Sequence, residues 1–492
     1  MKYSLVSSFE KRAKASVLIV PFWEGMKDVA HLGSWKDSFQ RVLESGDFKA
    51  KSGDTLFLYP EGFKEERVLL LGLGTEDKAS SETLRRAYAQ AVRAIGHVKA
   101  KSCHVIFPAS AHLSRAEVLT GCWEGILLSN YAFNQLKGTS QKEAPPLLEN
   151  VGFIGLDEKD QSILDRLQTI AEGIYFVRDL VNGNADEVNP SMLAQSARDL
   201  EKISSKIKTT IHDKKWLEKE KMGLILAVNR ASKEEPYLIE ISYKGNPSSK
   251  EHIVLVGKGV TYDTGGLALK TVEGMIAMKC DMAGAAAVLG TIRTAALLNL
   301  EVNISVLVPT VENCIDSLSY KHGDVYRSYS GKTVEINNTD AEGRLILADA
   351  LAYAVKNLSP SYVIDLATLT GNVVLALGEQ MAGFCANDET LAKKLRDAGV
   401  KSSDFLWQLP LCNDYKEAFK SDIADMVNSG GRDAGAIKGA LFLQEFIGSA
   451  KWAHIDIAGA AFWTKPKYYH TTKATGYGVR LLIEFLTKIS HS

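Results

Sequence analysis

The sequence predicts an α/β protein with two domains: a smaller N-terminal one, and a larger C-terminal one whose central mixed sheet is flanked by helices. The chain has 492 residues, about three times the length of a typical ~150-residue domain. Its first third alternates short apolar runs with patterns of helical periodicity, which is typical of a largely parallel sheet covered by helices. A stretch rich in turn-forming residues, 182–190, then separates this part from the rest.

The N-terminal domain is predicted to contain five strands and two long helices. The apolar stretch 15–23 is interpreted as the first strand, ended by Pro21, because proline cannot donate to a sheet ladder. The expected strands are 16–20, 55–59, 67–73, 102–107 and 151–156, and the expected helices are 81–97 and 116–134. The polar segment 137–146, which contains two prolines, is expected to be a surface loop.

The connection to the second domain is predicted to be a helix followed by a turn. Helical spacing covers 159–179, and Asn189 is placed to cap a new helix with Pro190 at its first position. We therefore expect an N-terminal α/β domain at 1–160, a linker helix and turn at 161–185, and the larger domain at 186–492. In the larger domain, strands are expected at 253–256, 302–308 and 362–366, and helices at 283–298 and 342–355.

Composition and charge narrow the class of protein. Hydrophobic residues make up 46% and charged residues 24% of the chain, which excludes disordered and collagen-like proteins. The formal net charge of -1 gives no general attraction to nucleic acid or to an anionic membrane. The six cysteines form no CxxC pair, which favours reduced thiols in a cytoplasmic protein. The stretch 15–23 is too short for a membrane span and lacks the cleavage site of a signal peptide.

Several common catalytic motifs are absent from the sequence. Gly331-Lys332-Thr333 resembles the end of a phosphate-binding loop, but the required earlier glycine is replaced by Tyr326. The glycines at 72 and 74 lack the third glycine of a dinucleotide fingerprint, and there is no HExxH or GxSxG. The ten histidines are dispersed, so the sequence predicts chemistry that does not depend on histidine.

Two segments combine glycine-rich turns with acidic residues. The first, 256–281 (VGKGVTYDTGGLALKTVEGMIAMKCD), opens with a buried strand and places Asp263 shortly before two glycines. The second, 337–345 (NNTDAEGRL), has Asp340 and Glu342 on either side of one alanine, and Arg344 follows. Asp281 ends the first segment, so four carboxylates lie beside apolar sequence.

A charge argument connects these residues to metal ions. If the four carboxylates converge in a poorly hydrated pocket, they cannot all stay ionised without cations. Two divalent ions would balance them, and oxygen ligands suit Mg²⁺, Mn²⁺ or Zn²⁺. Lys258 then fits as a neutral amine ligand, because an ammonium beside two dications is disfavoured and its pKa should fall. Lys270 and Arg344 remain as charged groups for an anion or a developing oxyanion.

Each residue alone also has a simple structural explanation. Asp340 and Asp281 could each cap the helix that follows, and Asp263 could be a turn residue. Lys258 and Lys270 could be surface lysines, and Met278 could belong to the core. Only their joint occurrence favours a functional site.

The joint pattern closely resembles the leucyl aminopeptidase family, the dinuclear-metal cytosol aminopeptidases. NTDAEGRL (338–345) matches the family signature at every position, while GKGVTYDTGG (257–266), Lys270 and KCDMAGAAAV (279–288) match closely. The resemblance covers the second domain. Departures from the family pattern are mild. Tyr262 and Thr264 replace the phenylalanine and the serine of the family's FDSGG, and Thr271 replaces the proline that usually follows the lysine. No proline follows Asn182, where the family usually enters the catalytic domain.

The resemblance implies a role for each matching residue. Asp263 and Glu342 would bridge two metals, Lys258 and Asp281 would complete the tighter site, and Asp340 would complete the other. Lys270 would polarise the scissile carbonyl, and Arg344 would hold a bicarbonate acting as general base. The implied substrate-binding residues are Met278, Asn338, Thr368 and Gly371, the last two at the ends of one segment.

The implied function is release of N-terminal residues, with leucine and other apolar residues preferred, in intracellular peptide turnover. The implied cofactors are two divalent ions per chain, Zn²⁺ and/or Mn²⁺, with Mg²⁺ or Co²⁺ as alternatives. A homohexamer is implied, and neither membrane nor nucleic acid is an expected partner. Two other hypotheses stay open: a binding role with an inactive site, and nucleic-acid binding through the N-terminal domain.

Overall fold

The computed structural model describes residues 1–26, 36–140 and 144–490, and its chain divides into two compact units. Unit 1 comprises Met1–Ala171 and Lys465–Thr472, and unit 2 comprises Glu172–Thr464 and Lys473–Ser492. The division falls within helix α4 (Gln161–Asn182). Each unit contains a sheet and helices, so the predicted two-domain α/β class is confirmed.

Unit 1 is built on a six-stranded sheet in the order β1-β6-β5-β2-β4-β3. All neighbouring strands are parallel except β3 and β4. The strands are β1 (Lys2–Val6), β2 (Val17–Trp23), β3 (Thr55–Leu58), β4 (Arg67–Gly74), β5 (Ser102–Ile106) and β6 (Asn150–Ile154), and the helices are α1 (Lys36–Ser45), α2 (Ser81–His97) and α3 (Arg115–Ser129). The described part of the predicted loop 137–146, which excludes 141–143, contains neither strand nor α-helix.

Three predictions about unit 1 are wrong. The predicted first strand is the second one, because β1 precedes it, and Pro21 lies inside β2 rather than ending it. Strand β5 pairs with β2 only as far as Ile19, so the missing N–H of Pro21 breaks no ladder bond to β5. Helix α3 ends five residues before Asn134, because the side chain of Asn130 bonds the backbone N–H and C=O of Leu148.

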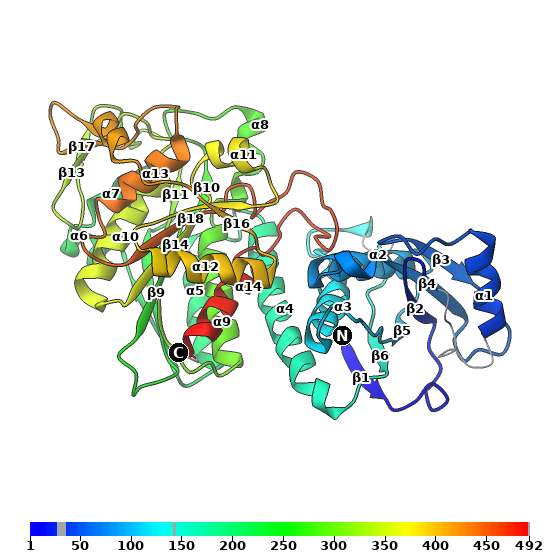
Figure 1. Ribbon diagram of the computed structural model, residues 1–492. Coiled ribbons are helices and arrows are strands. Elements are labelled where there is room, and N and C mark those ends of the chain that lie inside the picture. Colours follow the sequence, from blue (N-terminus) through cyan, green and yellow to red (C-terminus); the bar gives the residue numbers. More distant parts are fainter. Residues whose placement is uncertain (27–35, 141–143, 491–492) are drawn as a thin grey trace. The chain divides into compact units, whose positions relative to one another are not determined.

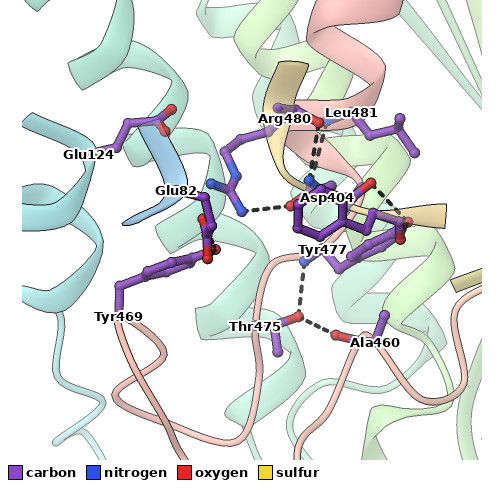
Figure 2. Close-up of polar contacts among 12 residues, drawn as sticks. Glu82, Glu124, Asp404, Ala460, Tyr469, Thr475, Tyr477, Arg480 and Leu481 are labelled. Atoms are coloured by element: carbon purple, nitrogen blue, oxygen red, sulfur yellow. Dashed lines mark hydrogen bonds and ion pairs between the residues drawn. The ribbon is translucent and has the colours of Figure 1, made fainter. Parts of the chain in front are cut away.

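The segment Lys465–Thr472 belongs to unit 1 although it comes from the C-terminal part of the sequence. The Tyr469 hydroxyl donates to a Glu82 carboxylate oxygen at 3.2 Å, and Figure 2 shows the two side chains together. The Thr471 hydroxyl donates to the carbonyl of Tyr131 at 2.6 Å. No pattern in the sequence indicated this long-range association.

Unit 2 is built on a nine-stranded sheet in the order β16-β15-β18-β14-β9-β11-β8-β7, with β10 also paired to β11. Its strands are β7 (Ile207–His212), β8 (Tyr237–Lys244), β9 (His252–Gly257), β10 (Gly259–Asp263), β11 (Asn303–Asn313), β14 (Tyr362–Ala367), β15 (Ala382–Ala386), β16 (Leu406–Gln408) and β18 (Trp452–Asp456). A smaller sheet contains β12 (Val325–Arg327), β13 (Thr333–Glu335) and β17 (Met426–Val427). The helices are α5 (Pro190–Asp199), α6 (Lys214–Glu220), α7 (Gly223–Val228), α8 (Val272–Met275), α9 (Ala283–Leu297), α10 (Glu342–Leu358), α11 (Gly371–Leu377), α12 (Glu389–Ser402), α13 (Gly435–Gln444) and α14 (Val479–Ser490).

Helices pack around the large sheet of unit 2 (Figure 1). Val254 and Val256 of β9 join the buried cluster formed with α7, α10 and α13. Ile253 and Leu255 alternate with them, so they point to the opposite face, and both are fully buried. Helix α9 contacts β9 and β14. The sheet is therefore covered on both faces, as parallel strands require.

Helix α9 lies in the one stretch of the described chain that is long and apolar enough, by composition, to cross a membrane, Val272–Leu297. In the structure 72% of that window is buried inside the protein. A short α8, a turn and α9 divide it.

The beginning of α14 is anchored by a buried carboxylate (Figure 2). Asp404 Oδ1 accepts from Arg480 at 2.7 Å, and Oδ2 accepts from the backbone N–H groups of Gly478 and Leu481. These N–H groups lie at the N-terminal end of α14, where backbone N–H donors have no partner within the helix. The predicted cap of α5 is also confirmed, because the Asn189 side chain accepts from Met192 N and Pro190 is the first helical residue.

The order of the strands brings several chain segments to one edge of the sheet. Strands β9, β10, β11, β14 and β18 run parallel to their neighbours in this group. Their carboxyl ends therefore meet at the same edge. In α/β sheets this edge is where ligands bind.

Candidate active site

The predicted acidic and basic residues follow the carboxyl ends of these strands. Lys258 comes directly after β9, and Asp263 is the last residue of β10. Asp281 lies in the turn before α9, and Asp340 lies just before α10, whose first residue is Glu342. All but Asp340 are nearly inaccessible, with 2% to 4% of their surface exposed. Residues more than 80 positions apart in the sequence thus share one buried cluster.

Two lysines hold the four carboxylates together. Lys258 Nζ lies 2.8 Å from Asp281 Oδ2 and 2.9 Å from Glu342 Oε1, and it donates to the carbonyl of Thr368 at 2.9 Å. Lys270 Nζ lies 2.8 Å from Asp263 Oδ2 and 2.5 Å from Asp340 Oδ1. The lysines are therefore neither surface residues nor isolated from the acids.

Two glycines make room for this arrangement. A Cβ on Gly343 would lie 2.5 Å from Lys258 Cε, so the lysine can cross the first turn of α10 only because position 343 has no side chain. Gly265 has a left-handed φ of +88°, and a Cβ there would lie 2.8 Å from Asp340 Oδ1. Glycine is the residue that accepts both conditions without strain.

The helix-cap explanation of the two aspartates is wrong. The N-cap of α9 is Met282 and that of α10 is Ala341, and neither makes a side-chain capping bond. Asp281 Oδ1 instead accepts from the Thr368 hydroxyl at 2.7 Å. The carboxylates are directed toward the cluster rather than toward helix N–H groups.

The electrostatics of the cluster show that the two ammonium groups compensate the acids incompletely. Burial raises the pKa of Asp263, Asp281 and Asp340, and the Glu342 carboxylate raises these pKa values further. Burial alone would also raise the pKa of Glu342, but Lys258 and Lys270 lower it below its ordinary value. Such a cluster favours additional positive charge.

For Lys258, burial alone lowers the pKa, but the carboxylates of Asp281, Glu342 and Asp263 raise it above its ordinary value. The surrounding carboxylates therefore favour the ammonium form of Lys258. The predicted neutral amine refers to the site with metal ions bound and stays a prediction.

The donor set fits divalent metal ions. Carboxylate oxygens of Asp263, Asp340 and Glu342 lie within 4.8 Å of one another. Asp281 Oδ2 is buried and accepts no hydrogen bond of good geometry from the described residues. Several convergent carboxylate oxygens are the ligands that hard and borderline divalent ions prefer.

The cluster lies in a cavity of about 500 Å³. Every residue predicted to act in the site contributes to its wall, namely Lys258, Asp263, Lys270, Met278, Asp281, Asn338, Asp340, Glu342, Arg344, Thr368 and Gly371. Met278 is only half-buried, so it is not a core residue. The structure therefore brings together all the residues that the sequence singled out.

Arg344 lies in the wall of this cavity, and not all of its N–H donors are used in hydrogen bonds to the described residues. Its Nη1 donates to the carbonyl of Asn428 at 3.0 Å, while its buried Nε has no hydrogen-bond partner among the described residues. Burial lowers the pKa of Arg344 to about 10, so the group is still charged at neutral pH. This guanidinium is suited to hold a small anion.

Asn313 is one positioning residue that the sequence did not reveal. It is fully buried at the end of β11, and its amide donates to Asp263 Oδ1 at 2.8 Å and to the carbonyl of Thr339 at 3.1 Å. The Thr339 hydroxyl in turn donates to the carbonyl of Gly265 at 2.7 Å. Asn313 thus joins the two acidic segments.

Asn428 fixes the second acidic segment from another side. Its Oδ1 accepts from the backbone N–H of Asn337 at 2.9 Å, and its Nδ2 donates to the carbonyl of Asn338 at 2.7 Å. In the sequence, Asn428 cannot be distinguished from the polar asparagines that occur in ordinary loops. Contacts between residues some 90 positions apart leave no pattern among neighbouring residues from which they could be predicted.

Buried Asp456, at the end of β18, holds the segment that begins at Thr368. Its Oδ1 accepts from Leu369 N at 3.1 Å, and its Oδ2 accepts from the Thr370 hydroxyl at 2.6 Å. Burial raises the pKa of this carboxyl group. The position of the cavity wall at 368–371 therefore depends on this residue.

A two-domain α/β fold with a carboxylate–lysine cluster at the carboxyl ends of parallel strands defines a metal-dependent hydrolase. The chain belongs to the cytosol aminopeptidase family: residues 175–483 match the catalytic domain of that family, and residues 19–140 match its N-terminal domain. It is therefore a metal-dependent aminopeptidase.

Relatives and solved structures agree with this assignment. The chain is 47% identical to the "Probable cytosol aminopeptidase" of Protochlamydia amoebophila, covering 100% of this chain and 99% of that one. The corresponding protein of Chlamydia caviae is 44% identical over 98% of both. A mutant of tomato leucine aminopeptidase has a TM-score of 0.88 at 31% identity, covering 99% of this chain and 96% of that one. The bottromycin maturation enzyme BotP in complex with Mn has a TM-score of 0.86 at 30% identity, covering 97% and 100%.

Proposed function

We propose that this chain is a leucyl aminopeptidase that holds two divalent metal ions and releases N-terminal residues, leucine and other apolar ones preferred, from peptides. The observation that carries the proposal is the convergence of four carboxylates and two lysines in one cavity of about 500 Å³. Buried acids with raised pKa values that share a cavity are typical of functional sites.

The metal ligands would be divided between two ions. Asp263 and Glu342 would bridge them, Lys258 and Asp281 would complete the tighter site, and Asp340 would complete the other through its side chain and carbonyl. When bound, the ions supply Lewis acidity and an activated bridging water. The neighbour that contains Mn supports manganese, and zinc fits the same donors.

The remaining polar residues would act on the substrate itself. Lys270 is half-buried beside Asp263 and Asp340, where its ammonium can donate to the carbonyl oxygen of the scissile bond as negative charge develops. Arg344 would hold a bicarbonate that takes a proton from the attacking water. Its Nε, which has no hydrogen-bond partner in the described part of the chain, and its position in the cavity wall support this role.

The first residue of the peptide would occupy the part of the wall formed by Met278, Asn338, Thr368 and Gly371. The flexible, apolar side chain of Met278 supports the preference for leucine. The amine of that residue must be neutral to bind a metal, which explains specificity for a free N-terminus.

We further propose a cytoplasmic role in intracellular peptide turnover and a homohexameric assembly. The relatives are named cytosol aminopeptidases, which supports the location.

The proposal is tested by metal analysis together with a panel of aminoacyl p-nitroanilides. We expect two divalent ions per chain, loss of activity on chelation, recovery with Mn²⁺ or Zn²⁺, and the highest kcat/KM for leucine. An active preparation with one ion or none per chain would contradict the two-metal site. A preference for charged residues would contradict the proposed leucine preference.

A further inference from the structure

One part of the cavity wall carries two cations that the proposed mechanism does not use. Arg432 and Lys438 both line the cavity that contains the carboxylate cluster. They lie in the loop before α13 and in the first turns of that helix. Lys258 and Lys270 each contact two carboxylates. In the part of the chain that the structure describes, neither Arg432 nor Lys438 has a carboxylate at ion-pair distance.

Lys438 is unusual because it is a nearly buried lysine that has no carboxylate partner among the described residues. Only 9% of the residue is exposed. Its Nζ donates to the carbonyl of Gly430 at 2.7 Å and lies 5.8 Å from the ring of Tyr415. One carbonyl uses one of its three N–H donors. Burying a charge without an anionic partner is unfavourable, so this arrangement favours an anion that enters the cavity.

Two neighbouring features add positive potential to the same wall. Arg432 is exposed on the loop, and its backbone carbonyl is held by the Asn372 amide at 3.0 Å. Helix α13 begins after Ala434, which provides no side-chain cap, so the first N–H groups of the helix add partial positive charge. The two cations and the start of α13 thus contribute positive potential to the same cavity.

This wall is fixed relative to the proposed metal ligands. Asn428, at the start of the loop, bonds the backbone of Asn337 and Asn338, and its own carbonyl accepts from Arg344. The Lys438 bond to Gly430 fixes the next part of the same loop. A group bound at Lys438 would therefore have a defined position relative to the reacting bond.

We propose that Arg432 and Lys438 bind a carboxylate on the part of the peptide that follows the scissile bond, so that the enzyme favours short or acidic substrates. This inference rests on the proposed function, which places the first residue at Met278 and Thr368–Gly371. The wall at 429–438 is then the surface left for the second residue. The carboxylate is either the C-terminus of a dipeptide or the side chain of an acidic second residue.

The experiment compares four substrates that share one scissile bond type: Leu-Gly-amide, Leu-Gly with a free C-terminus, Leu-Asp-amide and Glu-Gly-amide. We expect kcat/KM for Leu-Gly, for Leu-Asp-amide or for both to exceed that for Leu-Gly-amide by about tenfold, the effect of one charge-assisted hydrogen bond. A gain only with Leu-Gly identifies the C-terminal carboxylate, and a gain only with Leu-Asp-amide identifies the side chain.

The same ratios are measured in variants, with each variant's own Leu-Gly-amide value as reference. Lys438→Met keeps the aliphatic packing and removes the charge, and Arg432→Ala changes an exposed residue that should not affect folding. Both should bring the carboxylate-to-amide ratio close to one, while Lys438→Arg should retain most of it. Lys215→Met, on the exposed side of α6, removes one charge outside the cavity and should leave the ratio at its wild-type value.

Three results would overturn the inference. The first is a wild-type ratio near one for both carboxylate substrates. The second is a ratio that survives both Lys438→Met and Arg432→Ala, even if Lys438→Met melts earlier, because Lys438 would then only anchor the loop. The third is a gain confined to Glu-Gly-amide, which would place the cations beside the first residue. Failure to cleave Leu-Gly-amide at all would instead contradict the proposed function.

Discussion

Replacing Gly343 by alanine would place a methyl group where the side chain of Lys258 now lies. The new Cβ would be 2.5 Å from Lys258 Cε and 2.6 Å from Nζ. Carbon atoms in contact are normally about 3.5–4.0 Å apart, so the lysine must move by roughly 1 Å. It is held at its end by Thr368 O, Asp281 and Glu342, at 2.8 to 2.9 Å, and the movement must weaken these contacts.

The expected effects on stability and on activity differ in size. Alanine in place of a helical glycine gains up to about 1 kcal/mol, while overpacking a tight site costs about 1–3 kcal/mol. The net loss of unfolding free energy is therefore at most about 3 kcal/mol, and the chain should remain folded. A shift of about 1 Å in a catalytic group can lower activity by roughly 10²-fold.

The assay measures kcat/KM with leucine p-nitroanilide, metal content and melting temperature for Gly343→Ala. The matched control is Gly96→Ala in α2, where the new Cβ would meet only Pro145 Cβ at an ordinary 3.5 Å; it should keep wild-type activity and melt no earlier. Gly343→Ala with wild-type activity and two metals per chain would refute the argument that the space at 343 sets the position of Lys258. A loss of activity that only follows unfolding would refute it as well.

The remaining predictions concern single side chains. Asp281→Asn should weaken the metal held with Lys258 by at least 10–100-fold, measured by calorimetry; unchanged affinity would exclude Asp281 as a ligand. Lys270→Ala should lower kcat on the order of 10²–10³-fold with metal content retained, whereas Arg344→Ala should lose less and recover partly with added bicarbonate. A Lys270→Ala variant that loses metal in proportion to activity would argue for a structural role. Burial raises the pKa of Asp349 to about 7, so the folded chain holds this proton more tightly than the unfolded chain. As pH rises from about 4 to 7, wild type should lose stability relative to Asp349→Asn, with no further change above pH 7; a melting-temperature difference independent of pH would contradict this.

The strands and helices that could be predicted are those whose signals are local. The helix predicted at 81–97 is observed over the same residues, and the start of α5 follows directly from Asn189 and Pro190. The wrong predictions concern strand and helix ends that are determined by contacts with residues distant in the sequence. Pro21 stays inside a strand because β5 does not extend to it, and Asn130 ends α3 because it bonds Leu148.

The candidate site was predictable to an unusual degree because its acids and bases lie in two short segments. A glycine-rich turn or a carboxylate before a helix is a pattern of neighbouring residues, so Asp263 and Glu342 could be found without a structure. Asn313 and Asn428 could not be found in this way. Each acts through hydrogen bonds to residues 26 to 91 positions away.

The sequence by itself determined the α/β class and which charged residues are candidates for the site, because periodicity, turn residues and side-chain charge are properties of short segments. Only the tertiary structure decided which lysine contacts which carboxylate, that residues 465–472 belong to unit 1, and that Lys438 is buried in the cavity wall. These features arise when strands of a parallel sheet bring distant residues to one edge. Their free energies depend on distance, burial and hydrogen-bond geometry, which a linear pattern of residues does not contain.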